Sequence, residues 1–186
     1  MQKKEEFSAQ YSLKRNTVNI FGPIDDAMSE IVIAQLQYLD DNGVDEITVQ
    51  INSPGGSVSA GHAIRDTMNY VKADISTVCV GIAASMAAIL LSSGSKGKRK
   101  ATPNSEIMIH QPLGGVQGQA SDIILAAEHI KSARSKLNKI LSENTGRSIE
   151  VIEKDTDRDY IMSAQEALEY GLIDVVIPCR NKAKGE

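Results

Sequence analysis

Residues 46–70, EITVQINSPGGSVSAGHAIRDTMNY, contain the pattern that decides the fold. The first six residues are rich in β-branched side chains and predict a strand over 46–51. The turn 52–56 follows with two consecutive glycines, and residues 59–70 predict a helix that leads to a further strand over 76–80. A strand, a turn and a returning helix form the βα unit from which sheets in α/β proteins are built.

The same alternation extends along the chain in both directions. Upstream, a strand is predicted over 17–21 and a helix over 26–41, whose apolar residues recur at steps of three and four until Asn42-Gly43 ends it. Downstream, the patterns predict an Ala-rich helix over 85–93, a strand over 106–109 and a long helix over 120–144. A short helix that opens with a capping box at 163 and a last strand over 173–177 follow. We therefore expect one α/β domain of repeated βα units, with a long helix that projects or packs against another subunit.

Composition narrows the classes of function. The 186 residues carry a net charge of −4, which argues against nucleic acid as the main ligand, and the longest near-apolar run, 78–91, is too short to span a membrane. The basic run 96–100 is predicted to be a solvated turn. Cys79 and Cys179 show no metal-binding spacing, so we expect each to be a core residue in a reducing compartment, the cytoplasm.

Ser85 is the first candidate catalytic residue. It follows a predicted buried strand and opens an Ala-rich helix, where its hydroxyl and the N–H of Met86 could face the same space. A helix N-cap or a small spacer residue is the alternative interpretation of this serine. The G-x-S-x-G motif is absent, so an α/β-hydrolase is not indicated.

The Gly-rich turn 52–56 and His110 are further candidates at the carboxyl ends of predicted strands. The paired glycines let a ligand approach the backbone, although a simple tight turn explains them too, and the Lys-Ser/Thr ending of a phosphate-binding loop is missing. His110 precedes Gln111-Pro112 in a position where ligands gather, or it is a hydrogen-bonded core histidine. His62 and His129 are weaker candidates because each lies within a predicted helix.

A basic histidine needs an acid to orient it, and residues 155–159 offer three aspartates among which the spacing does not choose. Asp155 also begins a calcium-loop pattern, but Tyr160 stands where that loop needs glycine, and Glu166 is already explained by the capping box with Ser163. We expect neither a metal nor a cofactor.

These pieces together resemble the Clp protease proteolytic subunit family, whose members are self-compartmentalising serine peptidases. The resemblance covers residues 13–178 as the peptidase domain, with a short N-terminal segment, 1–12, and a polar C-terminal tail, 179–186. The matching blocks are 21–26 (FGPIDD), 51–58 (INSPGGSV), 81–88 (GIAASMAA), 108–115 (MIHQPLGG), 117–120 (QGQA) and 155–174.

The resemblance implies a set of functional residues. Ser85 would be the nucleophile, His110 the base and Asp159 the orienting acid. The backbone N–H groups of Gly56 and Met86 would form an oxyanion hole. The backbone near Val58 and Leu113 would pair with an extended peptide substrate.

The resemblance also implies an assembly and partners. Two stacked heptameric rings would enclose the serines, with helix 120–144 as the contact between rings, and an AAA+ unfoldase would feed unfolded proteins to the chamber for protein quality control. Few residues precede Leu13, and Gln50 and Arg65 stand where tyrosines are common at the ATPase-docking surface. We therefore expect weak unfoldase docking, or a mixed ring with a paralogous subunit.

Two other functions stay open at this point. A crotonase-fold acyl-CoA enzyme shares the Gly-rich turn and a pair of N–H donors, but usually relies on Glu or Asp as its base. A weakly active or idle subunit of a mixed ring would keep Ser85, His110 and Asp159 without aligning them.

Overall fold

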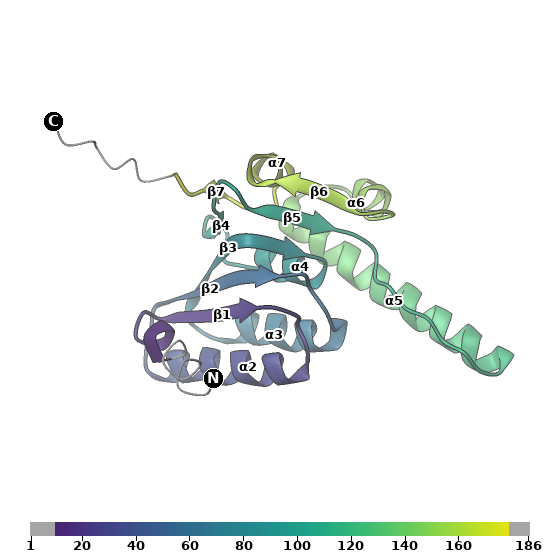
Figure 1. The fold of residues 1–186 in the computed structure, drawn as a ribbon, viewed down its shortest axis with the longest axis horizontal. Helices are drawn as coiled ribbons and strands as arrows, with labels where there is room; N and C mark the ends of the chain where they lie inside the picture. The colour runs from purple at the N-terminus through teal and green to yellow at the C-terminus, as the bar shows by residue number, and fades with distance from the viewer. Residues whose placement is uncertain (1–9, 179–186) are drawn as a thin grey trace.

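A computed structural model describes residues 10–178 of the chain, which fold around one sheet of seven strands (Figure 1). β1, β2, β3, β4 and β7 follow one another in parallel, β5 pairs in parallel with the second half of β3, and β6 pairs antiparallel with β5. The strands are β1 (Thr17–Phe21), β2 (Glu46–Ser53), β3 (Asp74–Ala84), β4 (Arg99–Ala101), β5 (Glu106–Ile109), β6 (Tyr160–Ser163) and β7 (Val175–Val176). The predicted α/β class is confirmed.

The helices begin and end where local chemistry allows it. Asp25 caps the first turn of α2 by accepting the N–H of Met28 at 2.8 Å, and Gly43 follows its end with a positive φ. Ser163 and Glu166 form the predicted capping box at the start of α7 (Ala164–Tyr170), and Gly171 ends that helix. The helices are α2 (Asp26–Asp41), α3 (Val58–Tyr70), α4 (Met86–Ser92), α5 (Ala120–Thr145), α6 (Ile149–Asp155) and α7 (Ala164–Tyr170).

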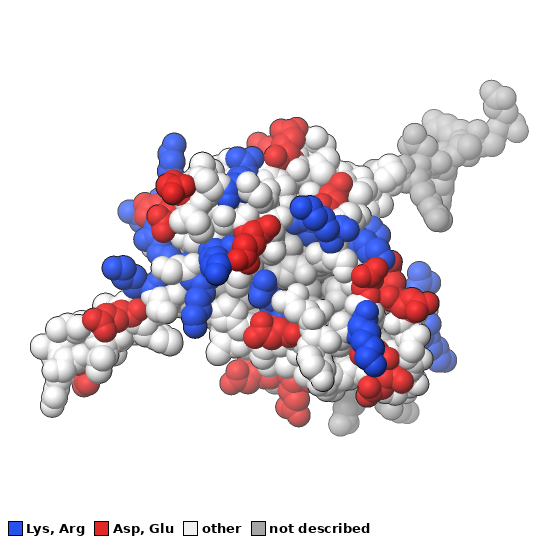
Figure 2. Space-filling model, turned by 180° about the vertical axis from the view of Figure 1, so that it is seen from behind, with Lys and Arg blue, Asp and Glu red and all other residues white. Residues whose placement is uncertain are grey.

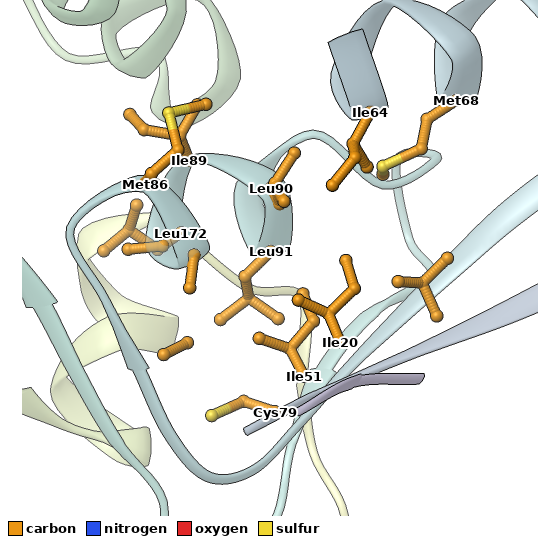
Figure 3. Packing of buried hydrophobic residues seen from close by; sticks show 14 of the residues in the cluster. Ile20, Ile51, Ile64, Met68, Cys79, Met86, Ile89, Leu90, Leu91 and Leu172 are labelled. Atoms are coloured by element: carbon orange, nitrogen blue, oxygen red, sulfur yellow. The ribbon is translucent and has the colours of Figure 1, made fainter. Parts of the chain in front are cut away.

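The core lies between one face of the sheet and the helices α2, α3 and α4. Alternate residues of β2 point into it, so that Val49 and Ile51 are fully buried while Gln50 between them faces the other side. Figure 3 shows Ile51 beneath Leu91 of α4, while Ile64 and Met68 of α3 extend the same cluster further up. Because α4 is buried along its whole length, the packing of this helix holds the backbone of the preceding residue, Ser85, in place.

Several element predictions need correction. β3 does not end at residue 80 but passes through Gly81, whose φ of +96° bends the strand so that its second half pairs with β5. The segments β4, α6 and β6 were not predicted, because each is short and owes its form to neighbours distant in sequence. The last strand covers only Val175–Val176 of the predicted 173–177.

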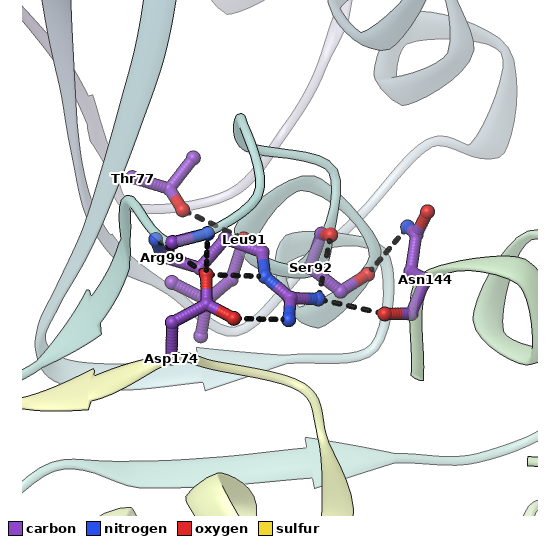
Figure 4. Close-up of polar contacts among 7 residues, drawn as sticks. Thr77, Leu91, Ser92, Arg99, Asn144 and Asp174 are labelled. Carbon is purple, nitrogen blue, oxygen red and sulfur yellow. Dashed lines mark hydrogen bonds and ion pairs between the residues drawn. The ribbon is translucent and has the colours of Figure 1, made fainter. Parts of the chain in front are cut away.

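The basic run 96–100 is not a solvated turn throughout. Arg99 begins β4 with its side chain 5% exposed and forms a two-point ion pair with Asp174. Its remaining N–H groups donate to the carbonyls of Ser92 in α4 and Asn144 in α5 (Figure 4). Burial raises the pKa of Asp174, but the hydrogen bonds from Arg99 outweigh it and leave this pKa below its ordinary value. Arg99 of β4 thus connects α4 and α5 to the residue that precedes β7.

The helix α5 extends well beyond the rest of the fold (Figure 1). Its 26 residues span about 39 Å at the usual rise. Only its second half is buried, whereas Ile123, Ile124 and Leu125 in its first half are 45–63% exposed. The segment 111–119 returns along the helix, since a side chain at Gly114 would touch Ile130. Figure 2 shows that the tip of this arm is mostly uncharged.

Two further expectations concern cysteine and membranes. Cys79 is fully buried, and burial raises the pKa of its thiol to about 11, which confirms it as an inert core residue. Cys179 lies outside the described residues. Within residues 10–178, no helix has the length and apolar character needed to cross a bilayer.

Candidate active site

Ser85 occupies a strained turn between β3 and α4. Its φ of +56° and ψ of −122° lie outside the regions that residues with a side chain favour, at a cost of about 1–3 kcal/mol. Although Ser85 stands at the N-cap position, its hydroxyl makes no capping hydrogen bond. The interpretation of this serine as a mere helix cap is therefore not supported.

Strand register places the other two candidate residues next to Ser85. β3 and β5 are in register at Ala84 and Met108, and the N–H of Ser85 donates to the Met108 carbonyl at 2.8 Å. β5 and β6 are in register at Ile109 and Tyr160, so His110 and Asp159 are the next opposed residues as the two strands separate. Three segments that are distant in sequence thus meet at one end of the sheet.

The three side chains form a continuous relay. The Nε2 atom of His110 lies 2.8 Å from Ser85 Oγ, and its Nδ1 atom lies 3.2 Å from Asp159 Oδ1. The side chain of His110 is 13% exposed, whereas that of Asp159 is 66% exposed. Asp155 and Asp157 are engaged elsewhere, with the hydroxyl of Tyr170 and the guanidinium of Arg134 respectively.

The Gly-rich turn 52–56 lies directly against the start of α4. The Asn52 side chain accepts the Ile82 N–H, and the buried Ser53 hydroxyl accepts the Gly55 N–H, so the turn is fixed to β3. A side chain at Gly55 would lie 2.8 Å from the Cβ of Ser85 and 3.0 Å from the nitrogen of Met86. Only glycine permits this approach.

The resemblance implies the backbone N–H groups of Gly56 and Met86 as oxyanion-hole donors, and the bonds of their neighbours show how each is oriented. The N–H of Ile24 donates to the Gly55 carbonyl, and the carbonyl of Ile24 accepts the N–H of Ser57. Successive residues of an extended chain point to opposite sides, so the N–H of Gly56 points away from Ile24. A side chain at Gly56 would collide with the backbone of Ile24. Met86 is the first residue of α4, and its N–H has no acceptor within the helix.

A small apolar cavity opens beside the serine and the histidine. Its volume is about 20 Å³, and its walls come from α3, α4, α5 and the segment after β5, namely Val58, Met86, Ile89, Pro112, Leu137 and Leu141. Leu113 next to it is 85% exposed, and Val58 is partly buried. Of the two predicted substrate-binding residues, Val58 lines this cavity, and Leu113 directly follows Pro112 of its wall.

The loop that carries Asp159 is held by contacts that the sequence did not predict. The N–H of Gln111 donates to the Thr156 carbonyl at 2.6 Å, and its side-chain amide donates to the Asp157 carbonyl at 2.8 Å. Thr156 is fully buried and its hydroxyl bonds to Ile152 and to Asn138 of α5. Arg134 was the available signal, because it is the one polar residue among apolar residues that recur at steps of three and four along helix 120–144. In the structure Arg134 contacts Asp157.

The remaining candidates do not join the relay. His62 of α3 and His129 of α5 both line a second, larger cavity next to the apolar one. Gln50 and Arg65 lie on opposite sides of the sheet in one subunit, since Gln50 faces away from the helices while Arg65 of α3 donates to the Ser93 hydroxyl. They do not form one surface within a single chain.

A family model matches almost the whole chain. The model of the family described as Clp protease matches residues 2–180 of the 186. A match over nearly the whole length, together with the α/β architecture, shows that the chain belongs to the Clp protease family.

Proposed function

We propose that the peptidase activity implied by membership of the Clp protease family is of the serine type, and that Ser85, His110 and Asp159 carry it out. The observation that supports this most is the relay of 2.8 Å and 3.2 Å between the three side chains. The substrates would be unfolded polypeptides and short peptides. The crotonase alternative finds no support in the family match, and the alignment of the relay favours an active subunit over an idle one.

The proposed mechanism follows from the chemistry of these groups. The Nδ1–H of His110 would donate a hydrogen bond to Asp159, which leaves a free electron pair at Nε2. His110 then takes the proton of Ser85 as the serine oxygen attacks the peptide carbonyl. The charged imidazolium then protonates the leaving amine, and an acyl-enzyme remains on Ser85. Water, deprotonated by the same histidine, attacks the ester and releases the second product.

The negative charge of the tetrahedral intermediate would be held by the N–H groups of Gly56 and Met86. Because both belong to backbone fixed by the core, they need little reorganisation during the reaction, and one such donor is worth roughly 10²–10³ in rate. The peptide would lie extended beside Val58 and Leu113, with one side chain directed at the mouth of the apolar cavity.

Members of the family generally form oligomers that work with AAA+ unfoldases. We propose two stacked heptameric rings in which the exposed apolar residues of the α5 arm meet those of the opposite ring.

The buried free thiol of Cys79 agrees with a cytoplasmic location. The polar Gln50 and the charged Arg65 suit an apolar docking pocket poorly, so we propose weak docking alone or a mixed ring with a paralogous subunit; tight unfoldase-stimulated degradation by the homo-oligomer would contradict this.

The replacement Ser85→Ala tests the function. We expect peptide hydrolysis to fall to background while the mass of the native assembly is unchanged, because alanine removes the nucleophile without altering the buried surroundings. Ser57→Ala is the control, since Ser57 is close in space and caps α3 but is not part of the relay. Hydrolysis that persists in Ser85→Ala would refute the assignment.

A further inference from the structure

A second cavity, of about 380 Å³, lies between α3 and α5 beside the apolar cavity and shares Val58 and Pro112 with it. We call it the α3–α5 cavity. Its volume falls within the range of ligand-binding cavities. It is lined by Val58, Ser59 and His62, by Pro112 and Leu113, and by His129, Ile130, Ser132, Ala133 and Lys136.

The polar side chains that line this cavity are a cation, imidazoles and hydroxyls. Lys136 supplies an ammonium, His62 and His129 supply imidazoles, Ser59 and Ser132 supply hydroxyls, and no carboxylate belongs to the lining. Between residues 10 and 178, no carboxylate forms an ion pair with Lys136. A cationic group without an ion-pair partner, in a hollow whose other polar groups are hydroxyls and imidazoles, is suited to an anion.

The charged groups around the cavity leave this balance intact. Asp66 and Glu143 line a neighbouring opening to which His62 and Lys136 also belong, and there the cations Arg65, Lys136 and Lys139 outnumber the two carboxylates. Burial lowers the pKa of His62, Asp66 opposes this, and Arg65 and Lys136 act with burial. The lowered pKa favours the neutral ring of His62, which acts as a hydrogen-bonding group.

The position of the cavity indicates where an anion would come from. Val58 and Leu113, beside which we place the extended peptide, both form part of its wall. A side chain of that peptide two or more residues from the apolar cavity would therefore face it. The apolar residues Pro112, Leu113 and Ile130 match the methylene groups of such a side chain, and Lys136 matches a terminal carboxylate.

We propose that the α3–α5 cavity binds the carboxylate of a Glu or Asp side chain in the peptide substrate, and that Lys136 with His62 gives the enzyme a preference for acidic residues at that position. The proposal rests on the proposed function. It adds a charged specificity site to the apolar one next to Ser85.

A set of peptides that differ at one position tests the proposal. Acetylated and amidated peptides carry Glu or Gln in turn at each of the four residues before and the three residues after the cleaved bond. At one position we expect kcat/KM to be about five- to tenfold higher for Glu than for Gln at low salt, and the ratio to fall as salt is added. Lys136→Met should bring that ratio to about one.

Two controls sharpen the result. Lys131→Met removes an exposed lysine of the same helix that does not line the cavity, and should keep the preference. Affinities of the Glu and Gln peptides for the Ser85→Ala variant report the preference by binding alone, so a failure of the proposed chemistry is distinguished from a failure of this site. A Glu preference that is absent at every position, or that survives Lys136→Met, overturns the proposal.

The same peptides with a free C-terminus separate the two sources of a carboxylate. An effect of Lys136→Met that is confined to peptides with a free terminal carboxylate would show that the cavity binds chain ends, and would overturn the assignment to an acidic side chain. An effect on the amidated Glu peptide confirms that assignment.

Discussion

The two hydrogen bonds of the relay lie in different surroundings. The bond between Ser85 and His110 joins residues fixed by buried strands and by the fully buried helix α4. The bond between His110 and Asp159 reaches a side chain that is 66% exposed, on a loop held through Gln111, Thr156 and α5. In the proposed mechanism, the two groups that attack are therefore held by the core, whereas the group that would orient the base is held by contacts near the arm.

The largest expected effect is on kcat and comes from comparing variants at the two hydrogen bonds of the relay. His110→Ala removes the base and should lower kcat by about 10⁶-fold, whereas Asp159→Asn should lower it by about 10⁴-fold, because the base survives in an unfavourable tautomer. Steady-state hydrolysis of one peptide, corrected with the Ser85→Ala background, measures both. Equal losses would contradict the idea that the exposed end only orients the base.

The second prediction concerns the fastening of the buried end. Asp174→Asn leaves the buried guanidinium of Arg99 without its carboxylate, and should lower the free energy of unfolding by about 3–5 kcal/mol. Urea unfolding at pH 7 measures it. Asp74→Asn is the matched control, because Asp74 pairs with Lys98 at an exposed site and its loss should matter much less.

The same pair makes stability depend on pH. Since the folded-state pKa of Asp174 lies below its ordinary value of 3.8, its contribution is fully present above about pH 4 and is lost as the pH falls through the lower folded-state pKa. The difference in stability between the parent protein and Asp174→Asn should therefore narrow below pH 4. A difference that stays constant down to pH 2 would show that the ion pair is not its source.

The smallest expected effect sharpens the comparison at the exposed end. Thr156→Val keeps the backbone bond to Gln111 but removes the hydroxyl that bonds to Ile152 and to Asn138, whose amide nitrogen already has no partner within residues 10–178. We expect a loss of about 1–2 kcal/mol in unfolding free energy and a several-fold lower kcat. Thr67→Val, which removes a comparable hydroxyl in α3, should leave kcat unchanged. An unchanged kcat in Thr156→Val would show that Asp159 does not need this anchor.

The sequence predicted the elements whose pattern is local. The strand 17–21 and the helix 26–41 are found with the predicted bounds, because β-branched residues, an apolar stripe and the Asn42-Gly43 end are all contained within each segment. Arg99 was misplaced in a solvated turn since its partner Asp174 lies 75 residues further along the chain. No local pattern reports such a contact.

The candidate site divides in the same way. Ser85 and His110 could be proposed from their places at the ends of predicted elements, but the positive φ of Ser85 has no sequence signal apart from that place. The choice of Asp159 among three aspartates came from the family resemblance alone. In the structure it follows from the β5–β6 register, which depends on a strand, β6, that the sequence did not predict.

The central claim is that Ser85 is the nucleophile of this chain, and covalent labelling tests it most directly. The intact oligomer is treated with a fluorophosphonate, and the modified residue is located by mass spectrometry of its peptides. We expect a single adduct per subunit, on Ser85, that forms far more slowly in His110→Ala. An adduct on another serine, or ongoing peptide hydrolysis by fully unlabelled protein in excess reagent, would contradict the account.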